Sequence, residues 1–441
     1  MIQVLHPMKG EEGLDACGLE YRLVTLGEDG KLVEQPGPSM KEEETTQMQM
    51  SMLNSNPNPN DDSSSGIENN DDNTCDYQNS DHEEEKKEDN PLHFPTKKNG
   101  RNNSQSASAS ANACNHSIRM TRLFHKDSNT MITSTNRKEF IADGAMYDIV
   151  CRLAMEYSQE VMVRDGQMEW VTIDQTLDDQ SSLTESIRTK PIRALVSSRL
   201  VEDESNLDKK PTLLIVTGKG HVQAGIWSRQ HLLTSGLECS SAVQFVSEAH
   251  NRNMNLVVLD PNARGDRFGM ATFEKSMRHL FRRWEKEGES SSSSSSRLKH
   301  QIQQNLYVLS HSQSGAQFVR HLLNKAECYL PHIGAIAFTD STHNIQWTKR
   351  NNLEALKNLL ECEKSLYFRR SDKTADYILN PFSSIGQVVD TDEFWKHRFG
   401  KIKTLCAGTS EHSLTNWFVR SHVWDHFDRF LVSNAPDAKE V

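Results

Sequence analysis

The chain has 441 residues, of which 35% are hydrophobic and 25% are charged, and it carries a formal net charge of −11. This composition is too polar for a fully globular chain of that length, so it predicts one sizeable domain together with much disorder. The negative charge gives no sign of a general nucleic-acid-binding surface, and no apolar run of about 18 residues predicts a membrane span.

The eight cysteines have neither CxxC pairs nor a metal-type spacing. We therefore expect reduced thiols, as in a cytosolic or nuclear protein, and we expect neither a metal site nor a cofactor. The first ten residues lack the cationic start and apolar core of a secretory signal, which favours a soluble chain that is not secreted.

Residues 1–35 are expected to form a short ordered element. The alternating stretch Leu19–Leu26, followed by Glu-Asp-Gly and by residues 31–33, is typical of a small hairpin. Residues 36–135 contain few aliphatic runs and most of the Asn, Ser and acidic clusters. Such a segment cannot bury enough apolar surface to offset its ordering entropy, so we predict a long disordered insertion there, before the main domain at 140–435.

The main domain alternates strands and helices. Uninterrupted aliphatic runs predict strands at 211–217, 256–259, 306–309, 333–338 and 402–407, and helical spacing predicts helices at 146–162, 272–287, 351–363 and 417–431. Strands without polar alternation are buried on both faces. The predicted fold class is therefore α/β, with a mostly parallel sheet and helices on both faces.

A serine stands between the third of these strands and a helix. The strand at 306–309 leads into Ser310-His311-Ser312-Gln313-Ser314-Gly315, and a helical pattern begins at Ala316. A strand, a turn of small residues with a serine at its tip, and a helix are the layout of a nucleophile elbow. Ser312 is the predicted nucleophile, although a loop serine on a nucleotide-type doubly wound fold is the alternative.

Polar residues follow the other strands at the edge where open α/β sheets bind ligands. Asp340 follows the fourth strand and His412 the fifth, which gives the order Ser…Asp…His of α/β-hydrolases. Serine needs an imidazole to take its proton and a carboxylate to orient that imidazole, so these three residues form a candidate triad. The backbone N–H groups of Gln313 and of Gly218 or Gly220 are the predicted oxyanion donors.

Other assignments stay open on the sequence alone. Asp340 could instead cap the following helix, and Asp372 and Glu411 are rival acids. His343 competes with His412 as the base. His221 and His311 are interpreted as structural hydrogen-bonding residues beside the site.

Two blocks of sequence support a family resemblance, Thr339-Asp340-Ser341-Thr342-His343-Asn344 and Ala407-Gly408-Thr409-Ser410-Glu411-His412-Ser413-Leu414-Thr415. With the segments at 213–220, 224–229 and 257–262 and with His311-Ser312, they resemble the Arb-type domain, named after a fission-yeast Argonaute-binding protein. The resemblance spans residues 140–431, with a weaker echo at 14–35. It implies an α/β-hydrolase-like fold with a candidate nucleophile at Ser312.

The resemblance also implies partners and a location. Animal members are described as cotranscriptional regulators, so it implies contacts with Argonaute and with chromatin-associated or splicing proteins, in the nucleus with a cytoplasmic pool. This chain has Thr217-Gly218 where the family typically has His-Gly, and Ser314-Gly315 where it has Gly-Gly. We expect the Cβ of Ser314 to crowd the turn and to weaken turnover.

Two functions of different kinds follow, and a plain structural subunit is a third, less favoured hypothesis. The first is a regulatory binding module for Argonaute-linked silencing, heterochromatin or cotranscriptional splicing control, and it is slightly favoured by the resemblance. The second is an active serine esterase or thioesterase, favoured by the complete set of Ser312, Asp340 and His412.

Overall fold

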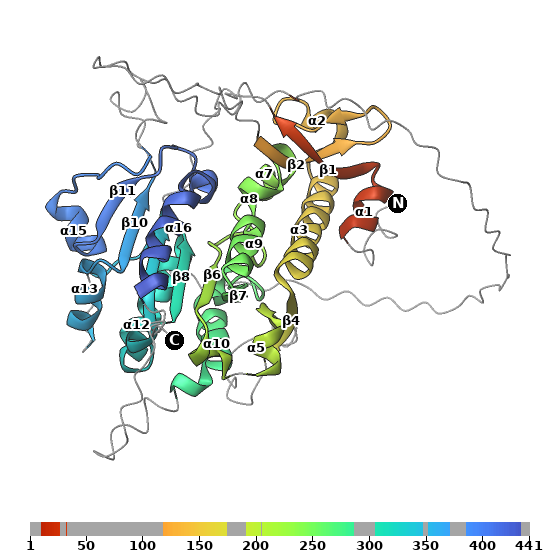
Figure 1. Ribbon diagram of the computed structural model, residues 1–441. Coiled ribbons are helices and arrows are strands. Elements are labelled where there is room, and N and C mark those ends of the chain that lie inside the picture. Colours follow the sequence, from red (N-terminus) through yellow and green to blue (C-terminus); the bar gives the residue numbers. More distant parts are fainter. Residues whose placement is uncertain are drawn as a thin grey trace, which may run out of the picture.

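The computed structural model describes residues 10–26, 32, 118–173, 191–203, 205–285, 305–346, 352–370 and 385–433. In these residues the main sheet has eight strands in the order β11-β10-β9-β8-β6-β7-β5-β4 (Figure 1). The strands are β4 (Met168–Ile173), β5 (Ile192–Ser197), β6 (Thr212–Val216), β7 (Asn255–Leu259), β8 (Leu306–His311), β9 (Ile333–Thr339), β10 (Ser365–Arg369) and β11 (Lys403–Cys406).

The strand order identifies the fold. Neighbouring strands from β7 to β11 are parallel, whereas β5 is antiparallel to both β7 and β4. Numbered along the chain from β4, the sheet reads 1-2-4-3-5-6-7-8 with the second strand reversed, which is the order of the α/β-hydrolase fold. The predicted α/β-hydrolase-like fold with a mostly parallel sheet is thus confirmed.

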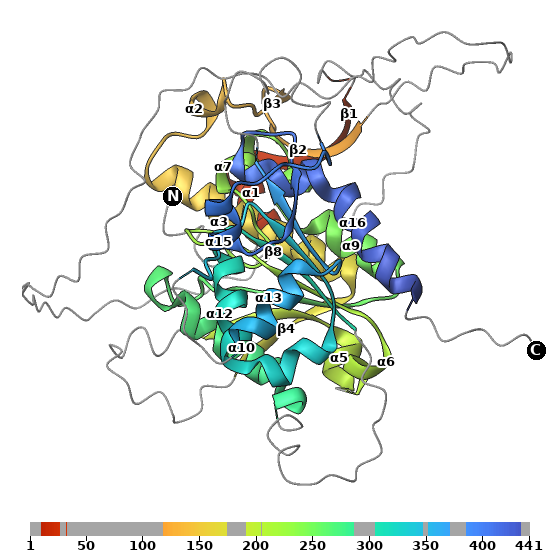
Figure 2. The same cartoon turned by 90° about the vertical axis from the view of Figure 1, so that its left-hand side faces the viewer.

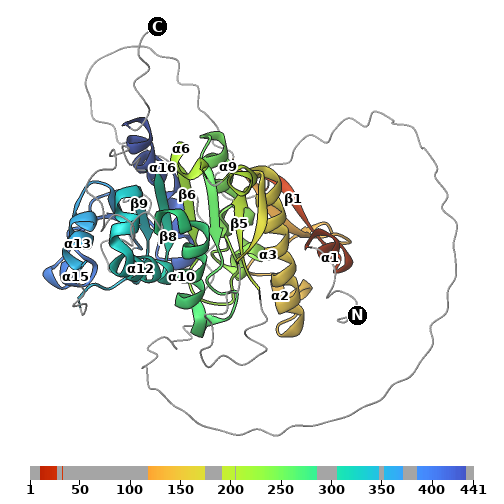
Figure 3. The ribbon, with the colours of Figure 1, turned by 90° about the horizontal axis from the view of Figure 1, so that it is seen from below.

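Helices cover both faces of this sheet. Leu213 and Ile215 of β6 pack on the side of α3 (Ala145–Gly166), α9 (Val243–Asn251) and α16 (Thr415–Ser433). Leu214 and Val216 pack on the opposite side, with α10 (Gly269–Leu280), α12 (Gln313–Tyr329) and α13 (Leu353–Glu361). In Figure 3, α9 and α16 lie on one side of β6 and β8, and α10 and α12 lie on the other. Successive side chains of a strand point to opposite faces, so one aliphatic run supplies both cores.

Shorter helices complete the domain. They are α5 (Ser198–Glu202), α6 (Asn206–Lys209), α7 (Arg229–Thr234), α8 (Leu237–Ser240) and α15 (Glu393–Phe399). The five strands predicted from aliphatic runs are all present, but β4, β5 and β10 were not predicted.

The N-terminal region differs from its prediction. After α1 (Gly10–Ala16), strand β1 (Leu19–Leu26) pairs along its whole length with β2 (Ile118–His125), and β2 pairs with the short β3 (Thr130–Met131), which precedes α2 (Arg137–Phe140). Among the residues that the structure describes, only the isolated bridge between Leu26 and Leu32 resembles the predicted hairpin. The predicted disordered insertion at 36–135 is therefore wrong from residue 118 onward, and residues 36–117 lie outside the described residues.

This three-stranded sheet packs on the hydrolase-like domain, beside α3 and α7 (Figures 1 and 2). The hydroxyl of Tyr21 donates to the carbonyl of Leu232 at 2.9 Å, and the backbone N–H of Thr121 donates to the carboxylate of Glu238 at 2.8 Å. These contacts attach the small sheet to the domain that was predicted to begin at residue 140.

Candidate active site

The turn after β8 has the backbone of a nucleophile elbow. Ser312 has φ 58° and ψ −128°, a region that residues with a Cβ rarely adopt, and α12 begins at the next residue. Its N–H donates to the carbonyl of Thr339 at 3.0 Å, and its own carbonyl accepts from the N–H groups of Gly315 and Thr342. These three bonds hold the strained residue in place, as expected where strain serves a site.

Small residues are required around the elbow. A Cβ on Gly315 would lie 1.8 Å from the hydroxyl oxygen of Ser341, so only glycine fits there. Ser314, by contrast, is fully buried, and its hydroxyl lies 2.8 Å from the carbonyl oxygen of Val216 and 2.7 Å from that of His311. The expected crowding by Ser314 is therefore not observed, because its side chain fits the turn and ties it to the end of β6.

Asp340 and His412 meet at the same edge of the sheet. Asp340 follows β9 with φ 44°, and its Oδ2 lies 2.5 Å from Nδ1 of His412. Since Nδ1 faces the carboxylate, Nε2 is the ring nitrogen left for a proton from serine. Nε of Arg370 lies 3.4 Å from the same carboxylate oxygen, and the Arg370 side chain is 53% exposed against 14% for Asp340.

The rival residues have other partners. The ring of His343 is buried, with Nδ1 2.8 Å from the Ser341 hydroxyl and Nε2 3.0 Å from the Phe399 carbonyl. Burial lowers the pKa of His343 to about 4, so this ring is a structural element rather than a base. Contacts with His231 and Ser413 hold the pKa of Glu411 at about 2. Asp372 lies outside the described residues.

His311 directly precedes Ser312 in the chain, and its side chain contacts that of His412. Its ring stacks on that of His412 with 4.6 Å between centroids, and it lies at 5.5 Å from the ring of Trp227. Its Nδ1 lies 3.1 Å from the carbonyl oxygen of Thr339, and burial, reinforced by His412, lowers its pKa well below the ordinary value. A neutral His311 therefore supports one face of His412, as its structural interpretation requires. His221, the other histidine interpreted in this way, is exposed.

No hydrogen bond joins the Ser312 hydroxyl to His412 in the part of the chain that the structure describes. Catalytic hydrogen bonds in unliganded enzymes are often long and shorten when substrate binds. The elbow and the pair of Asp340 and His412 thus lie at the same edge of the sheet, and the hydrogen bond between the Ser312 hydroxyl and His412 is the contact that has yet to form.

The oxyanion side contains Gln313 and Gly218. Gln313 is the first residue of the 17-residue helix α12, so its N–H has no partner within the helix and lies at the positive end of the helix dipole. A Cβ on Gly218 would lie 2.8 Å from the Cβ of Ser312 and 3.3 Å from its Oγ, which places this glycine against the nucleophile. A Cβ on Gly220 would have no atom within 4 Å, so Gly220 lies away from the serine.

Three functional candidates were missed from the sequence. Arg370 touches the acid, Thr339 binds both Ser312 and His311, and Asn262 holds the loop at Gly218. Each follows or ends a strand at the carboxyl edge of the sheet, and that position is the signal that could have identified them.

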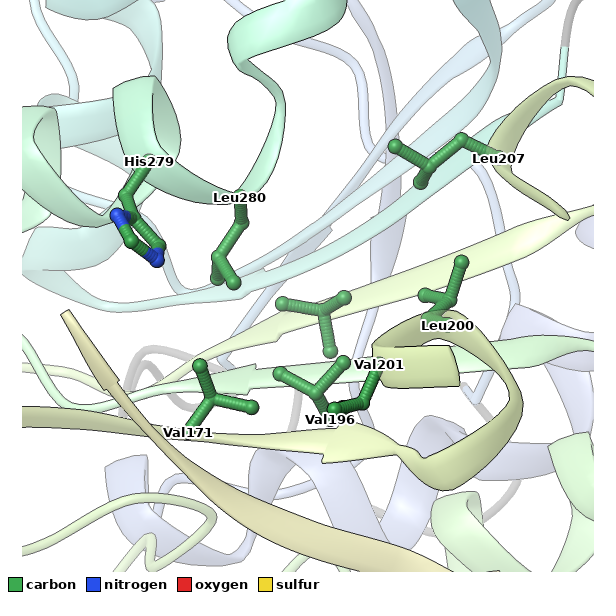
Figure 4. Close-up of a pocket in the computed structure, with 8 residues that line it drawn as sticks. Val171, Val196, Leu200, Val201, Leu207, His279 and Leu280 are labelled. Carbon is green, nitrogen blue, oxygen red and sulfur yellow. The ribbon is translucent and has the colours of Figure 1, made fainter. Parts of the chain in front are cut away.

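A separate apolar pocket of about 140 Å³ lies beside β4 and β5 (Figure 4). Seven aliphatic side chains and one histidine line it, namely Val171, Val196, Leu200, Val201, Leu207, Val257, Leu280 and His279. Because β5 is antiparallel to β7, with Val196 opposite Val257, the end of β5 that leads into α5 lies beside the start of β7. The pocket therefore lies away from the edge that holds Ser312.

Residues 204–359 match the model of the Arb2 domain family. This stretch of the chain is similar to an Arb2 domain. The resemblance predicted from the sequence is confirmed over residues 204–359, which contain Gly218, Ser312 and Asp340, whereas His412 follows this stretch in the chain.

Several solved hydrolase structures are similar to this chain. The esterase LipW from Mycobacterium marinum is 9% identical, with 67% of this chain and 93% of that chain covered and a TM-score of 0.32. An esterase from Pyrobaculum calidifontis is 10% identical over 69% and 98% of the two chains, with a TM-score of 0.32. An S-formylglutathione hydrolase from Staphylococcus aureus is 11% identical over 60% and 96%, with a TM-score of 0.30. No curated protein matches the chain.

Two further properties concern the described residues alone. They contain no group of three or more His, Cys, Asp or Glu side chains arranged to hold a metal ion. None of their helices is long and apolar enough to cross a membrane.

Proposed function

We propose that the Arb2 domain of this chain is a serine hydrolase that cleaves an ester or thioester, with Ser312 as the nucleophile. The observation that carries this proposal is the backbone of Ser312, at φ 58° and ψ −128° between β8 and α12. A serine held in that conformation exposes its hydroxyl at the end of the sheet, where Asp340 and His412 form a hydrogen-bonded pair.

The reaction begins when the Ser312 oxygen attacks the carbonyl carbon of the substrate. His412 takes the hydroxyl proton at Nε2, while Asp340 keeps the proton at Nδ1 and stabilises the imidazolium. The N–H of Gln313, at the start of α12, donates to the developing oxyanion.

This attack forms a tetrahedral intermediate, which then expels the alcohol or thiol of the substrate. The leaving group receives the proton from His412, and the acyl group stays on Ser312. Water attacks this ester with His412 as the base, and the acid product departs. No other group is required for the proton balance, because His412 accepts one proton and returns it in each half of the cycle.

The proposal is tested with the purified full chain and a series of p-nitrophenyl esters of increasing acyl length. Turnover by the wild type that is lost in both Ser312→Ala and His412→Ala supports it. Hydrolysis that persists in Ser312→Ala, or a folded wild type that releases no nitrophenol above the buffer rate, overturns it.

The Arb2 match supports a second function. We propose that the same domain acts in Argonaute-linked silencing, heterochromatin or cotranscriptional splicing control, through contacts with Argonaute and with chromatin-associated or splicing proteins, in the nucleus with a cytoplasmic pool. A direct test is co-precipitation of tagged full-length chain with Argonaute from nuclear and cytoplasmic fractions. Binding that is equal for the wild type and Ser312→Ala supports an interaction independent of catalysis, and the absence of Argonaute from both precipitates contradicts this second function.

A further inference from the structure

The loop that follows β6 lies against the nucleophile and is held by a side chain from the next strand. Asn262, which follows β7, donates from its amide nitrogen to the carbonyl of Gly218 at 2.8 Å and to that of Val222 at 3.1 Å. One side chain thus ties both ends of the loop Gly218-Lys219-Gly220-His221-Val222. The first residue of this loop is the glycine that faces Ser312.

Asn262 is itself fixed in place. Its backbone N–H donates to Oδ1 of Asp260 at 3.0 Å, and its carbonyl accepts from the N–H of Gly265 at 2.8 Å. The amide therefore reaches the loop from a rigid turn, so its two hydrogen bonds define where the loop lies relative to β7.

Because Asn262 fixes the carbonyl of Gly218, it also fixes the direction of the N–H of Lys219. The peptide bond between Gly218 and Lys219 is planar and trans, so its C=O and N–H point in opposite directions. When Asn262 binds the Gly218 carbonyl, the N–H of Lys219 must point away from Asn262. The side chain of Lys219 is half exposed, and its Nζ lies 3.9 Å from Oδ2 of Asp266.

We propose that Asn262 is a positioning residue that orients the N–H of Lys219 as the second oxyanion donor, beside that of Gln313. This inference rests on the proposed hydrolase and changes the assignment of the second donor from Gly218 or Gly220 to Lys219. Asn262 acts through the loop and does not itself touch the substrate. Donors that are aimed before the substrate arrives stabilise an oxyanion without reorganisation during the reaction.

The test compares the full-length wild type with Asn262→Asp, which keeps the shape of the side chain and removes both N–H donors. Active sites are first counted with a fluorophosphonate, and kcat is then expressed per titrated site. Loss of one oxyanion donor lowers kcat by about 10²–10³, so misdirecting one should lower kcat per site by about tenfold to hundredfold, with KM nearly unchanged. A purely structural role would instead lower the number of sites and the melting temperature, but not kcat per site.

Asn206→Asp is the matched control. The Asn206 amide also donates to a backbone carbonyl, that of Arg199 in α5 at 2.8 Å, but it lies in α6, beside the remote pocket. Its kcat per site should equal that of the wild type. Should N262D fail to fold, Asn262→Ala removes the whole amide without adding a charge, and it should lower kcat per titrated site to a similar extent.

Three outcomes are distinguishable. A lowered kcat per site in N262D alone supports the inference. A kcat per site within about twofold of the wild type overturns it and leaves the hydrolase proposal standing. A wild type that is neither labelled nor active overturns the proposed hydrolase, and the role of Asn262 falls with it.

Discussion

The parallel and antiparallel halves of the main sheet are built from similar aliphatic strands, but one half ends in polar groups and the other in an apolar pocket. In the half from β6 to β11, the strands stop at residues with unusual backbones, such as Ser312 and Asp340, and polar groups converge at one edge. In the half made by β4 and β5, the reversed strand leads into α5 and α6, where aliphatic side chains enclose an apolar pocket. The polar groups of the candidate site therefore converge only where parallel strands bring their carboxyl ends together.

Buried histidines also separate the two halves. His311, His321, His343 and His426 are buried, lie in β8, in α12, after β9 and in α16, and have lowered pKa values. The parallel half thus contains both the proposed reactive groups and the groups that must stay neutral for the fold to persist.

The largest effect is expected at the nucleophile. Ser312→Ala should lower kcat by about 10⁴ to 10⁶, because members of a triad act as a unit. Partner binding and the melting temperature should change little, since the Ser312 side chain makes no structural hydrogen bond in the described residues. Hydrolysis of a p-nitrophenyl ester measures the residual kcat, and a decrease of less than tenfold would contradict the central role of this serine.

A smaller loss of activity is expected at the acid. Asp340→Asn should lower kcat by about 10² to 10⁴, because the 2.5 Å bond that orients His412 is lost or reversed. Arg370→Gln, which removes only the neighbouring cation, should retain most of the activity. Equal losses in the two variants would mean that the orientation of His412 depends on Arg370 as much as on Asp340.

Acid should destabilise the parallel half first. The pKa values of His321, His343 and His426 fall from an unfolded value of 6.5 to about 4. Below pH 6.5 these histidines bind protons in the unfolded chain but stay neutral in the folded chain. Their contribution to the free energy of unfolding is therefore complete above pH 6.5 and is lost as the pH falls toward 4. Burial raises the pKa of Asp260 to about 7, so below pH 7 the folded chain binds a proton at this carboxyl more tightly than the unfolded chain does. Asp260 therefore partly offsets the loss of stability that the histidines cause as the pH falls.

Urea unfolding at pH 7.5 and pH 5 measures this effect, and hydrogen exchange locates it. Stability should fall by several kcal/mol at pH 5, on the order of 1.4 kcal/mol per histidine and pH unit, with exchange rising first in α12 and α16. Equal stability at the two pH values would contradict the neutral histidines.

Removing backbone strain should stabilise the elbow. Ser312→Gly places the residue that best tolerates φ 58° at this position, and it should raise the free energy of unfolding by about 1 kcal/mol while abolishing activity. Ser312→Ala keeps the Cβ and serves as the control for losing the hydroxyl. If the glycine variant is not more stable than the alanine variant, the strain at Ser312 is small.

The smallest effect is expected at the remote pocket. Val201 lies at its rim and is 46% exposed, so Val201→Phe can cover the opening without entering the core. Its kcat/KM should stay within about twofold of the wild type. A large loss of ester hydrolysis would instead make the pocket part of the substrate site.

Sequence alone predicted five of the six parallel strands, all but β10, and missed the antiparallel strands β4 and β5 of the main sheet and β2 of the small sheet. Runs such as Thr212–Val216 have no polar residue inside the strand and can be read directly. In β2, Arg122 is buried because its guanidinium donates to the carbonyl of Thr234, a partner far away in the chain. A buried arginine looks like a surface residue in a sequence, so the strand was assigned to the disordered insertion.

The site was predictable to the extent that it depends on strand ends. Ser312, Asp340 and His412 each follow a recognisable strand, so their order suggested a hydrolase. The choice between Asp340 and Glu411, and between His412 and His343, depends on which side chains face each other across loops. Asn262 was not assigned a role because its importance lies in two carbonyl contacts that no residue pattern encodes.

The most direct test of the account is the intact mass of the full-length chain after treatment with a fluorophosphonate. An activated serine displaces fluoride from phosphorus and keeps the phosphonyl group, so the wild type should gain one adduct, on the peptide that contains Ser312. Ser312→Ala and His412→Ala should gain none. A folded wild type with no adduct, or an adduct that persists in Ser312→Ala, would contradict a working nucleophile at this elbow.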